Sequence, residues 1–383
     1  MKKGLAFLFF VFALINLIIF SSGKTWIYKA VGITYLKGYT STYIGDFIYF
    51  PSNKIVAGEH QEWPISKNYN KKESPTFINK IHDELETVAF IVIQNDSIKH
   101  EQYWHGYSAD SMSNSFSMAK SWVSTLIGIA IKDGKIKSLD QKVCDFLPEF
   151  CIGKKSNISV KHLLTMSSGL DWKEDYYNPI GKTAYAYYGN NLRELVLSLN
   201  AVESPGKIFK YHSSCTQILT LLLEKATEKT ISKYASEKLW KPLGAKHSAL
   251  WSTDRKGGDE KGFCCINSNA RDFARIGKLY LNSGNWNGKQ ILDSSYVEKA
   301  TSAAFLIDKN GNKNKNYGYH FWLTHHKKLD IYSARGLWGQ YVICIPKKRM
   351  VIVRLGRKYG APLQDSHHDD FYAFIDAALE MFP

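Results

Sequence analysis

The residue types and spacing best suited to chemistry are a serine and a lysine three positions apart, Ser117 and Lys120. A serine hydroxyl is a weak nucleophile at its ordinary pKa and needs a base beside it. Residues three positions apart share one face of a helix, so the lysine amine is expected to reach the serine oxygen. Apolar neighbours such as Phe116 and Trp122 are expected to bury the amine and lower its pKa. The pair predicts a nucleophilic serine with a lysine base.

The S-x-x-K pattern alone is weak evidence, because it also occurs at Ser21–Lys24 and at Ser204–Lys207. Its ordinary interpretation is a helix start with an exposed lysine. The copy at 117 differs from the others because it lies between a predicted β-hairpin and a strongly apolar helix. That position favours Ser117 as the catalytic serine.

A second candidate is the Tyr-x-Ser sequence formed by Tyr211 and Ser213, in a predicted loop before a helix that starts near Thr216. If Lys120 lowers the pKa of Tyr211, the phenol can carry a proton between Ser117 and the leaving group. The alternative is an amphipathic tyrosine with a buried ring and a solvated hydroxyl.

A third candidate is the segment 336–340, Gly-Leu-Trp-Gly-Gln, directly before a predicted strand. Glycine permits close approach of another group to a strand edge. The backbone N–H of Gln340, following Gly339, is predicted to form an oxyanion hole with that of Ser117. The alternative is a plain glycine-containing turn.

Strand patterns occur early and late in the chain, and helical patterns lie between them. Hairpins are predicted at 88–104 and 341–354. Helical periodicity follows Ser117 and recurs to about residue 300, and a last helix is expected over 369–381. The expected fold class is α+β, with an antiparallel β-sheet from the N- and C-terminal segments, flanking helices, and an inserted, mostly helical subdomain at 135–300. Residues 24–84 are expected to be an irregular lead-in to a domain at 85–383.

The N-terminus has the layout of an export signal. Lys2 and Lys3 precede an apolar run from Leu5 to Phe20, and small residues follow at 21–23. The run is also at the short edge of a membrane span of about 17–25 residues. Residues 1–23 are therefore a signal peptide or a membrane anchor, and both alternatives remain open. Either one engages the membrane during export and predicts an extracytoplasmic protein, periplasmic or secreted, with or without an anchor.

The compartment has a consequence for the cysteines. In an oxidising compartment Cys144 and Cys151 are close enough in sequence to form a disulfide, although spacing alone leaves the pairing open. Cys215 and Cys344 are predicted to be small buried hydrophobic residues.

The overall composition is that of a globular protein, with 44% hydrophobic and 22% charged residues. The net charge of +15 is scattered rather than clustered with aromatic residues, so no nucleic-acid partner is predicted. The histidine pairs lack the H-E-x-x-H spacing and no C-x-x-C pair occurs, so neither a metal nor another cofactor is predicted. The sequence does not indicate an oligomeric state.

The order Ser-x-x-Lys, Tyr-x-Ser and a glycine-containing segment before a late strand resembles the serine β-lactamase and penicillin-binding-protein superfamily. The likeness is strongest to the class C β-lactamase-like branch, with its esterases and 6-aminohexanoate-oligomer hydrolases. It extends over residues 85–380 and includes 158–172, 270–277 and 317–322.

The resemblance implies a β-lactamase/transpeptidase-like fold and a role for each matching residue. Ser117 is implied as nucleophile, Lys120 as base and Tyr211 as second proton carrier. The remaining implied residues bind substrate or the oxyanion: Ser213 as a polar contact, Gly339 and Gln340 as the oxyanion strand, and Tyr176 as a cleft residue.

One departure from the family pattern bears on the substrate. Where the superfamily carries Lys-Thr-Gly or a His-x-Gly variant, this chain has Leu337, Trp338 and Gly339. The group that helps to hold a substrate carboxylate is therefore missing, unless Arg335 replaces it. The departure favours an uncharged ester or amide, and Trp338 is expected to line an apolar acyl pocket.

Three functions follow from these residues. The leading one is an exported serine hydrolase that cleaves an ester or amide bond of a small-molecule or peptide-like substrate through an acyl-enzyme on Ser117. The second is a penicillin-binding D,D-peptidase or β-lactamase. The third is a catalytically silent exported binding protein on the same scaffold. No G-x-S-x-G sequence is present, which disfavours an α/β-hydrolase.

Overall fold

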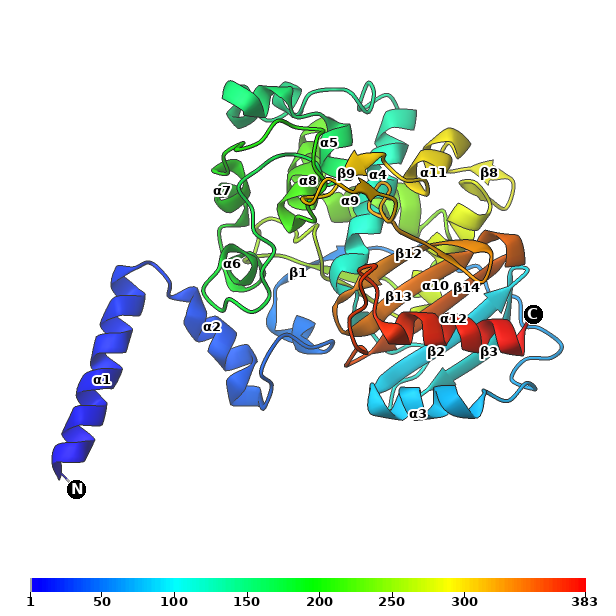
Figure 1. The fold of residues 1–383 in the computed structure, drawn as a ribbon, viewed down its shortest axis with the longest axis horizontal. Helices are drawn as coiled ribbons and strands as arrows, with labels where there is room; N and C mark the ends of the chain where they lie inside the picture. Colours follow the sequence, from blue (N-terminus) through cyan, green and yellow to red (C-terminus); the bar gives the residue numbers. More distant parts are fainter. Residues whose placement is uncertain (1) are drawn as a thin grey trace.

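A six-stranded antiparallel sheet, built from both ends of the chain, forms one half of the molecule (Figure 1). The computed structural model describes residues 2–383. The strand order is β11-β12-β13-β14-β2-β3. The strands are β2 (Thr87–Gln94), β3 (Ser97–Tyr103), β11 (Trp322–His326), β12 (Leu329–Gly336), β13 (Gln340–Ile345) and β14 (Met350–Gly356). Both predicted hairpins are present, and β14 pairs with β2 to join the two ends of the chain.

Helices cover both faces of this sheet. Strand β2 is buried from Thr87 to Ile93, as its unbroken apolar run requires. Helix α10 (Ala270–Leu281) packs against β13 and β14 on one face. Helices α3 (Thr76–Glu84) and α12 (Asp369–Met381) pack on the other face, with Phe90, Phe371 and Phe374 in their shared core (Figure 1). The last helix has the bounds that its periodicity predicted.

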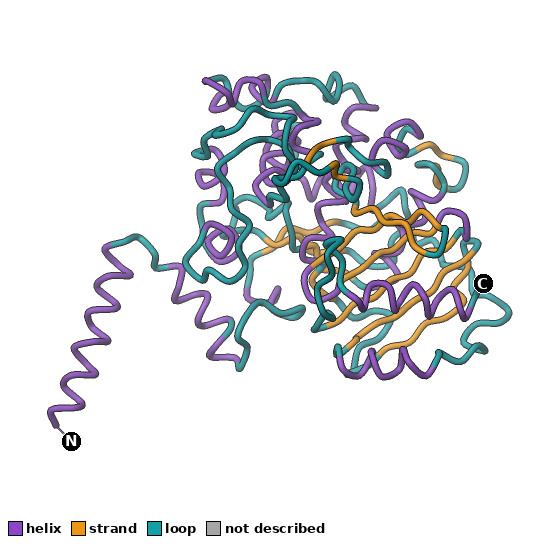
Figure 2. The backbone as a smooth tube through the Cα atoms, viewed as in Figure 1, coloured by secondary structure: helices purple, strands orange, loops and turns teal. Residues whose placement is uncertain are grey.

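The other half of the molecule is mostly helical (Figure 2). Its helices are α4 (Ala119–Lys132), α5 (Val160–Leu164), α6 (Lys182–Tyr188), α7 (Leu192–Leu197), α8 (Ser213–Thr227), α9 (Ile231–Ala235) and α11 (Ser294–Ala300). Helix α4 is buried at every position from Ala119 to Ala130 and packs against α8. Its buried hydroxyl side chains, Ser121, Ser124 and Thr125, are all hydrogen-bonded, as burial of polar groups requires.

A second sheet has the order β1-β5-β6-β4, with β1 (Ser52–Ile55), β4 (Ser113–Asn114), β5 (Ala249–Ser252) and β6 (Ile266–Ser268). Strands β5 and β6 come from the segment 135–300 that was expected to be mostly helical, and β1 and β4 come from the chain before it. Two short ribbons add β7 (Asn285–Trp286) with β8 (Lys289–Gln290), and β9 (Leu306–Ile307) with β10 (Lys313–Asn314). These strands are too short to give a clear period-two pattern.

The segment 24–84 is more ordered than the sequence suggested. It contains helix α2 (Trp26–Ile33), β1 and α3. Strand β1 pairs with β5, and Ile55 and Trp63 belong to the main hydrophobic core. The segment is therefore part of the same folded body as the residues after 85.

Helix α1 (Lys2–Ser21) stands apart from that body (Figure 1). None of its residues is buried, and the mean hydropathy of its most apolar window is 2.5. Its length and composition are sufficient to cross a membrane, and they fit a signal sequence equally well.

Candidate functional site

The candidate nucleophile lies at the start of the buried helix α4. A 3-10 turn, Phe116–Met118, precedes the helix. Phe116 has a φ of 43°, a left-handed conformation that side chains with a Cβ disfavour. Among the described residues 113–130, Ser117 is the one side chain that is not buried. The fold thus presents this hydroxyl outward from an otherwise closed core.

Lys120 lies directly beneath Ser117. Its Nζ donates to the Ser117 Oγ at 2.9 Å and to the carbonyl oxygen of Phe263 at 2.8 Å. The side chain is 1% exposed. Burial lowers the pKa of Lys120 to about 8, against a smaller opposing effect of the Glu174 carboxylate. An appreciable fraction of this amine is therefore neutral near pH 7 and able to accept a proton.

Tyr211 completes the cluster from the loop before α8. Its hydroxyl lies near enough to the Ser117 hydroxyl to have its pKa affected by it, and its ring centroid lies 5.1 Å from the Lys120 Nζ. Burial, followed by repulsion from Glu174, raises the pKa of Tyr211 above its ordinary value. The sequence argument for a proton-carrying phenol was conditional on a pKa lowered by Lys120, and the direction is the opposite. Tyr211 is thus a neutral phenol, equipped to donate a proton rather than to remove one.

Glu174 is a site residue that the sequence reasoning passed over. Its carboxylate accepts from the backbone N–H of Ser213 at 2.8 Å, from the Ser213 Oγ at 2.7 Å and from the indole of Trp172 at 2.8 Å. Its charge influences the pKa of both Lys120 and Tyr211. The signal available was a glutamate within an acidic, aromatic-rich loop, a pattern that by itself does not separate a site carboxylate from a solvated one.

Tyr176 and Ser213 both meet this carboxylate. The Tyr176 side chain is 54% exposed, yet its hydroxyl end is enclosed close to Glu174 and Ser117, which both affect its pKa. Burial of that hydroxyl and the neighbouring Glu174 charge raise the pKa of Tyr176 well above its usual range. The Ser213 hydroxyl donates its hydrogen bond to Glu174. The structure therefore brings both predicted binding residues to the Ser117 cluster.

The glycine-containing segment is placed differently from the expectation. Gly336, the last residue of β12, approaches the backbone two residues before Ser117 so closely that a Cβ would overlap the Ser115 carbonyl oxygen. A Cβ on Gly339 would instead overlap the guanidinium of Arg354. The side-chain amide of Gln340 donates to the carbonyl oxygens of Leu337, Trp338 and Gly356 inside the sheet.

The residue next to the nucleophile is therefore Gly336, three positions before the predicted glycine. Glycine spacing alone did not distinguish the two, because both are followed by strand-compatible residues. This close approach favours the end of β12 over Gly339 and Gln340 as the strand beside the nucleophile, and the oxyanion role of either segment stays a prediction.

Trp338 and Arg335 lie on either side of this strand end. The Trp338 indole donates to the Thr42 carbonyl at 2.8 Å and stacks on Tyr359 with ring centroids 5.2 Å apart. The Arg335 guanidinium lies 4.7 Å from the Trp322 ring centroid, and its positive charge opposes the rise in the pKa of Tyr211. A cation is thus present near the cluster although the lysine of the usual motif is not.

Two disulfides are present in the structure. Cys144 bonds to Cys151 with a Cα–Cα distance of 4.8 Å, which settles the pairing that the sequence left open. Cys264 bonds to the adjacent Cys265. Cys215 and Cys344 are free and buried, as predicted. Within residues 2–383, no three His, Cys, Asp or Glu side chains form a group that could hold a metal ion.

The chain was compared with known proteins. The Beta-lactamase family model matches residues 77–375. The chain is 26% identical to a 6-aminohexanoate-dimer hydrolase of Paenarthrobacter ureafaciens over 304 residues, covering 75% of this chain and 76% of that protein.

Solved structures share the fold. A putative 6-aminohexanoate-dimer hydrolase from Bacillus anthracis superposes with a TM-score of 0.75 at 22% identity, covering 94% of this chain and 97% of that one. A family VIII carboxylesterase superposes with a TM-score of 0.62 at 17% identity, covering 80% and 98%. Because the family model spans most of the chain, including the Ser117 cluster, this protein belongs to the Beta-lactamase family.

Proposed function

We propose that this chain is an exported serine hydrolase that cleaves an uncharged ester or amide through an acyl-enzyme on Ser117. The observation that carries the proposal is the contact of the partly exposed Ser117 hydroxyl with both the Lys120 amine and the Tyr211 phenol. The hydrolase class follows from the family, and the aminohexanoate-dimer hydrolase and the carboxylesterase supply the amide and ester precedents.

In the proposed acylation step, neutral Lys120 takes the proton of Ser117 as its Oγ attacks the substrate carbonyl. The oxyanion is stabilised by the backbone N–H of Ser117 and by that of Leu337, which follows the close-approaching Gly336. Tyr211, held as a neutral phenol, donates its proton to the leaving group. Protonated Lys120 lies 5.1 Å from the Tyr211 ring centroid and is the nearby source for restoring that proton.

Deacylation reverses the proton path. Lys120, neutral again after returning its proton to Tyr211, takes a proton from the water that attacks the acyl carbonyl. The Ser117 oxygen leaves when the tetrahedral intermediate collapses, and it recovers that proton from Lys120. Glu174 holds Ser213 in place through the entire cycle, because its hydrogen bonds to Ser213 do not involve the reacting atoms, and its charge acts on the neighbouring Tyr176. We assign Glu174 as a positioning residue rather than a catalytic one.

A D,D-peptidase or β-lactamase is the second candidate. It is supported by the family and by the Arg335 guanidinium close to Tyr211, a cation of the kind that binds a substrate carboxylate. The guanidinium is already engaged by His367 at 2.9 Å and by the Trp322 ring. This engagement favours the uncharged substrate.

The N-terminal segment supports the proposed export. Helix α1 makes no buried contact with the hydrolase body, so its removal costs the fold little, and its retention tethers the enzyme to a membrane. The proposed location is extracytoplasmic, either periplasmic or secreted, in a free or anchored form.

The test is active-site labelling. A fluorophosphonate probe is expected to modify the wild-type protein at Ser117, identified by peptide mapping, and Ser117→Ala is expected to abolish both labelling and turnover of a short-chain p-nitrophenyl ester. Ser121→Ala is the matched control, since Ser121 is a buried serine on the same helix. Turnover retained in Ser117→Ala refutes the proposal. Labelling by fluorescent penicillin without ester turnover would replace it with the second candidate.

A further inference from the structure

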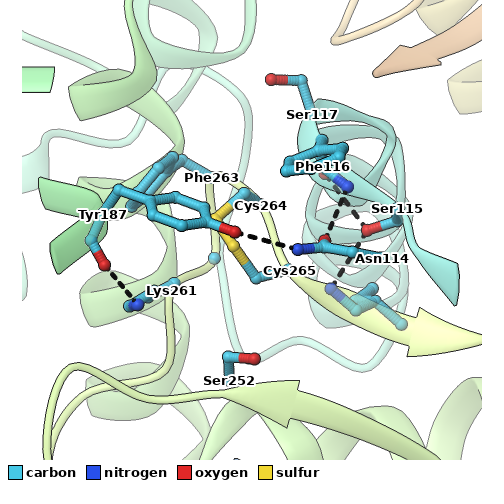
Figure 3. The surroundings of a disulfide bond; sticks show 12 residues. Asn114, Ser115, Phe116, Ser117, Tyr187, Ser252, Lys261, Phe263, Cys264 and Cys265 are labelled. Carbon is cyan, nitrogen blue, oxygen red and sulfur yellow. Dashed lines mark hydrogen bonds between the residues drawn. A yellow bond between two sulfur atoms is a disulfide. The ribbon is translucent and has the colours of Figure 1, made fainter. Parts of the chain in front are cut away.

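The two adjacent cysteines, Cys264 and Cys265, form a disulfide directly after Phe263 (Figure 3). The Phe263 carbonyl is a hydrogen-bond acceptor of Lys120. Both cysteine side chains are buried, at 3% and 1% exposure. Because the residues are neighbours in the chain, the bond closes a small ring that contains their own peptide bond. Such a ring restricts the backbone dihedral angles on both sides of that peptide bond.

One peptide unit, between Phe263 and Cys264, connects the ring to the carbonyl that accepts from Lys120. The carbonyl of Phe263, which accepts the hydrogen bond from Lys120 at 2.8 Å, belongs to the peptide bond between Phe263 and Cys264. The N–H of the same peptide unit, on Cys264, donates to the Lys261 carbonyl at 3.0 Å. Any rotation of this peptide plane turns the Phe263 oxygen away from the Lys120 Nζ.

The other side of the ring has an unfavourable backbone conformation. Cys265 has a φ of 73°, in the left-handed region that favours glycine. The carbonyls of the two cysteines are fixed from outside the ring, since Cys264 accepts from the Trp251 indole at 3.0 Å and Cys265 accepts from the Ser252 N–H at 3.0 Å. The disulfide adds a covalent constraint to these hydrogen bonds, and it opposes the tendency of Cys265 to leave the left-handed region.

We propose that the Cys264–Cys265 disulfide positions the catalytic amine by fixing the Phe263 carbonyl. A neutral amine carries two N–H groups and one lone pair. In this neutral form the contact with Ser117 reverses: with one N–H committed to Phe263, the lone pair of Lys120 is available to accept from the Ser117 hydroxyl, 2.9 Å away. The inference rests on the proposed role of Lys120 as base, and it makes Cys264 and Cys265 positioning residues.

Formation of this bond requires an oxidising compartment, as the proposed export provides. The S–S bond forms when the two thiols lose two protons and two electrons, and a protein or small-molecule disulfide takes up both by thiol–disulfide exchange, becoming a dithiol. Reduction by dithiothreitol is the reverse reaction, in which the protein gains two thiols and dithiothreitol closes into its own cyclic disulfide.

The experiment compares two double variants. Cys264→Ala with Cys265→Ala removes the ring and leaves a Cβ at the left-handed position. Cys264→Ala with Cys265→Gly also removes the ring but supplies the residue that adopts this conformation freely. The first is expected to slow fluorophosphonate labelling and ester turnover about 10- to 100-fold, the range for losing one hydrogen bond to an ionisable group. The second variant is expected to have labelling and turnover rates within about threefold of those of the wild-type protein.

Two controls separate this role from general stability. Cys144→Ser with Cys151→Ser removes the other disulfide and is expected to keep wild-type labelling. The wild-type chain is also denatured, reduced and refolded with dithiothreitol, because the ring is buried. This treatment is expected to slow labelling and ester turnover in the wild-type protein and to leave both rates unchanged in the alanine–glycine variant. Free thiols at 264 and 265 in the oxidised folded protein overturn the proposal, and so do equal labelling rates in wild type and the double-alanine variant, or equal losses in both ring variants.

If the proposed function is wrong, the wild-type protein itself is neither labelled nor active. The positioning role is then tested directly, by following the pKa of the Lys120 amine through its 13Cε chemical shift in lysine-labelled protein. No variant substitutes the other titratable groups that interact electrostatically with Lys120, which are Glu174, Cys215 and His320. The Lys120 pKa is then expected to change in the double-alanine variant and to return in the alanine–glycine variant. An unchanged pKa in both overturns the positioning role.

Discussion

Raising the pH from 6 to 9 is expected to increase kcat/KM for a p-nitrophenyl ester through one ionisation, that of Lys120. Burial lowers the pKa of this amine from 10.5 to about 8. At pH 7 about 9% of amines with a pKa of 8 are neutral, against about 0.03% of amines with a pKa of 10.5. The buried position therefore increases the fraction of usable base about 300-fold at neutral pH.

The direction of this pH dependence follows from the role of Lys120 as a base. Activity requires the deprotonated amine, so the logarithm of kcat/KM is expected to rise with a slope of about one below pH 8 and to level above it. The Glu174 carboxylate raises the pKa of Lys120, so Glu174→Gln is expected to move this acid limb to lower pH. Glu84→Gln, which removes the same charge from an exposed ion pair with Lys80 on α3, is the control and is expected to leave the limb in place.

Two results would contradict this reasoning. A flat profile between pH 6 and 9 would exclude Lys120 as the titrating base. A limb near pH 10.5 would mean that the amine is solvated in the folded enzyme, contrary to its 1% exposure.

Three further predictions concern stability and individual steps. Because the folded-state pKa of Lys120 lies below its unfolded value, the residue destabilises the fold below pH 8, by about 3 kcal/mol at pH 7. Lys120→Met is thus expected to raise the free energy of unfolding at pH 7 by up to about 3 kcal/mol in urea titrations, a gain that disappears as the pH rises from 8 to 10.5; a less stable variant at pH 7 contradicts it. Tyr211→Phe is expected to lower kcat about 100- to 10,000-fold for alkyl esters and much less for p-nitrophenyl esters, whose leaving group needs no proton, so equal losses for both would remove the phenol as proton donor. Gly336→Ala is expected to slow labelling of Ser117 while circular dichroism stays native, because the new Cβ meets the Ser115 carbonyl; an unchanged labelling rate would show that this strand end is not at the site.

Much of the fold was predictable because the deciding signals are local. The apolar run of β2 and the hairpin turns predicted the main sheet, and the period of 3.6 predicted α4, α8, α10 and α12. The second sheet was missed because β4 and β6 are only two and three residues long. Strands of that length acquire their conformation from their partners, and β1 finds its partner β5 about 200 positions along the chain.

For the candidate site, the sequence by itself determined the residue types and their order: the serine, the lysine one helical turn later, the tyrosine before α8, and a glycine-rich strand end. Only the tertiary structure decided their states. It gave Lys120 a lowered pKa and Tyr211 a raised one, brought Glu174 to Ser213, and placed Gly336 rather than Gly339 against the nucleophile. The physical reason is that spacing along a chain fixes which groups share a turn, whereas desolvation, charge and close approach depend on neighbours that arrive from distant segments.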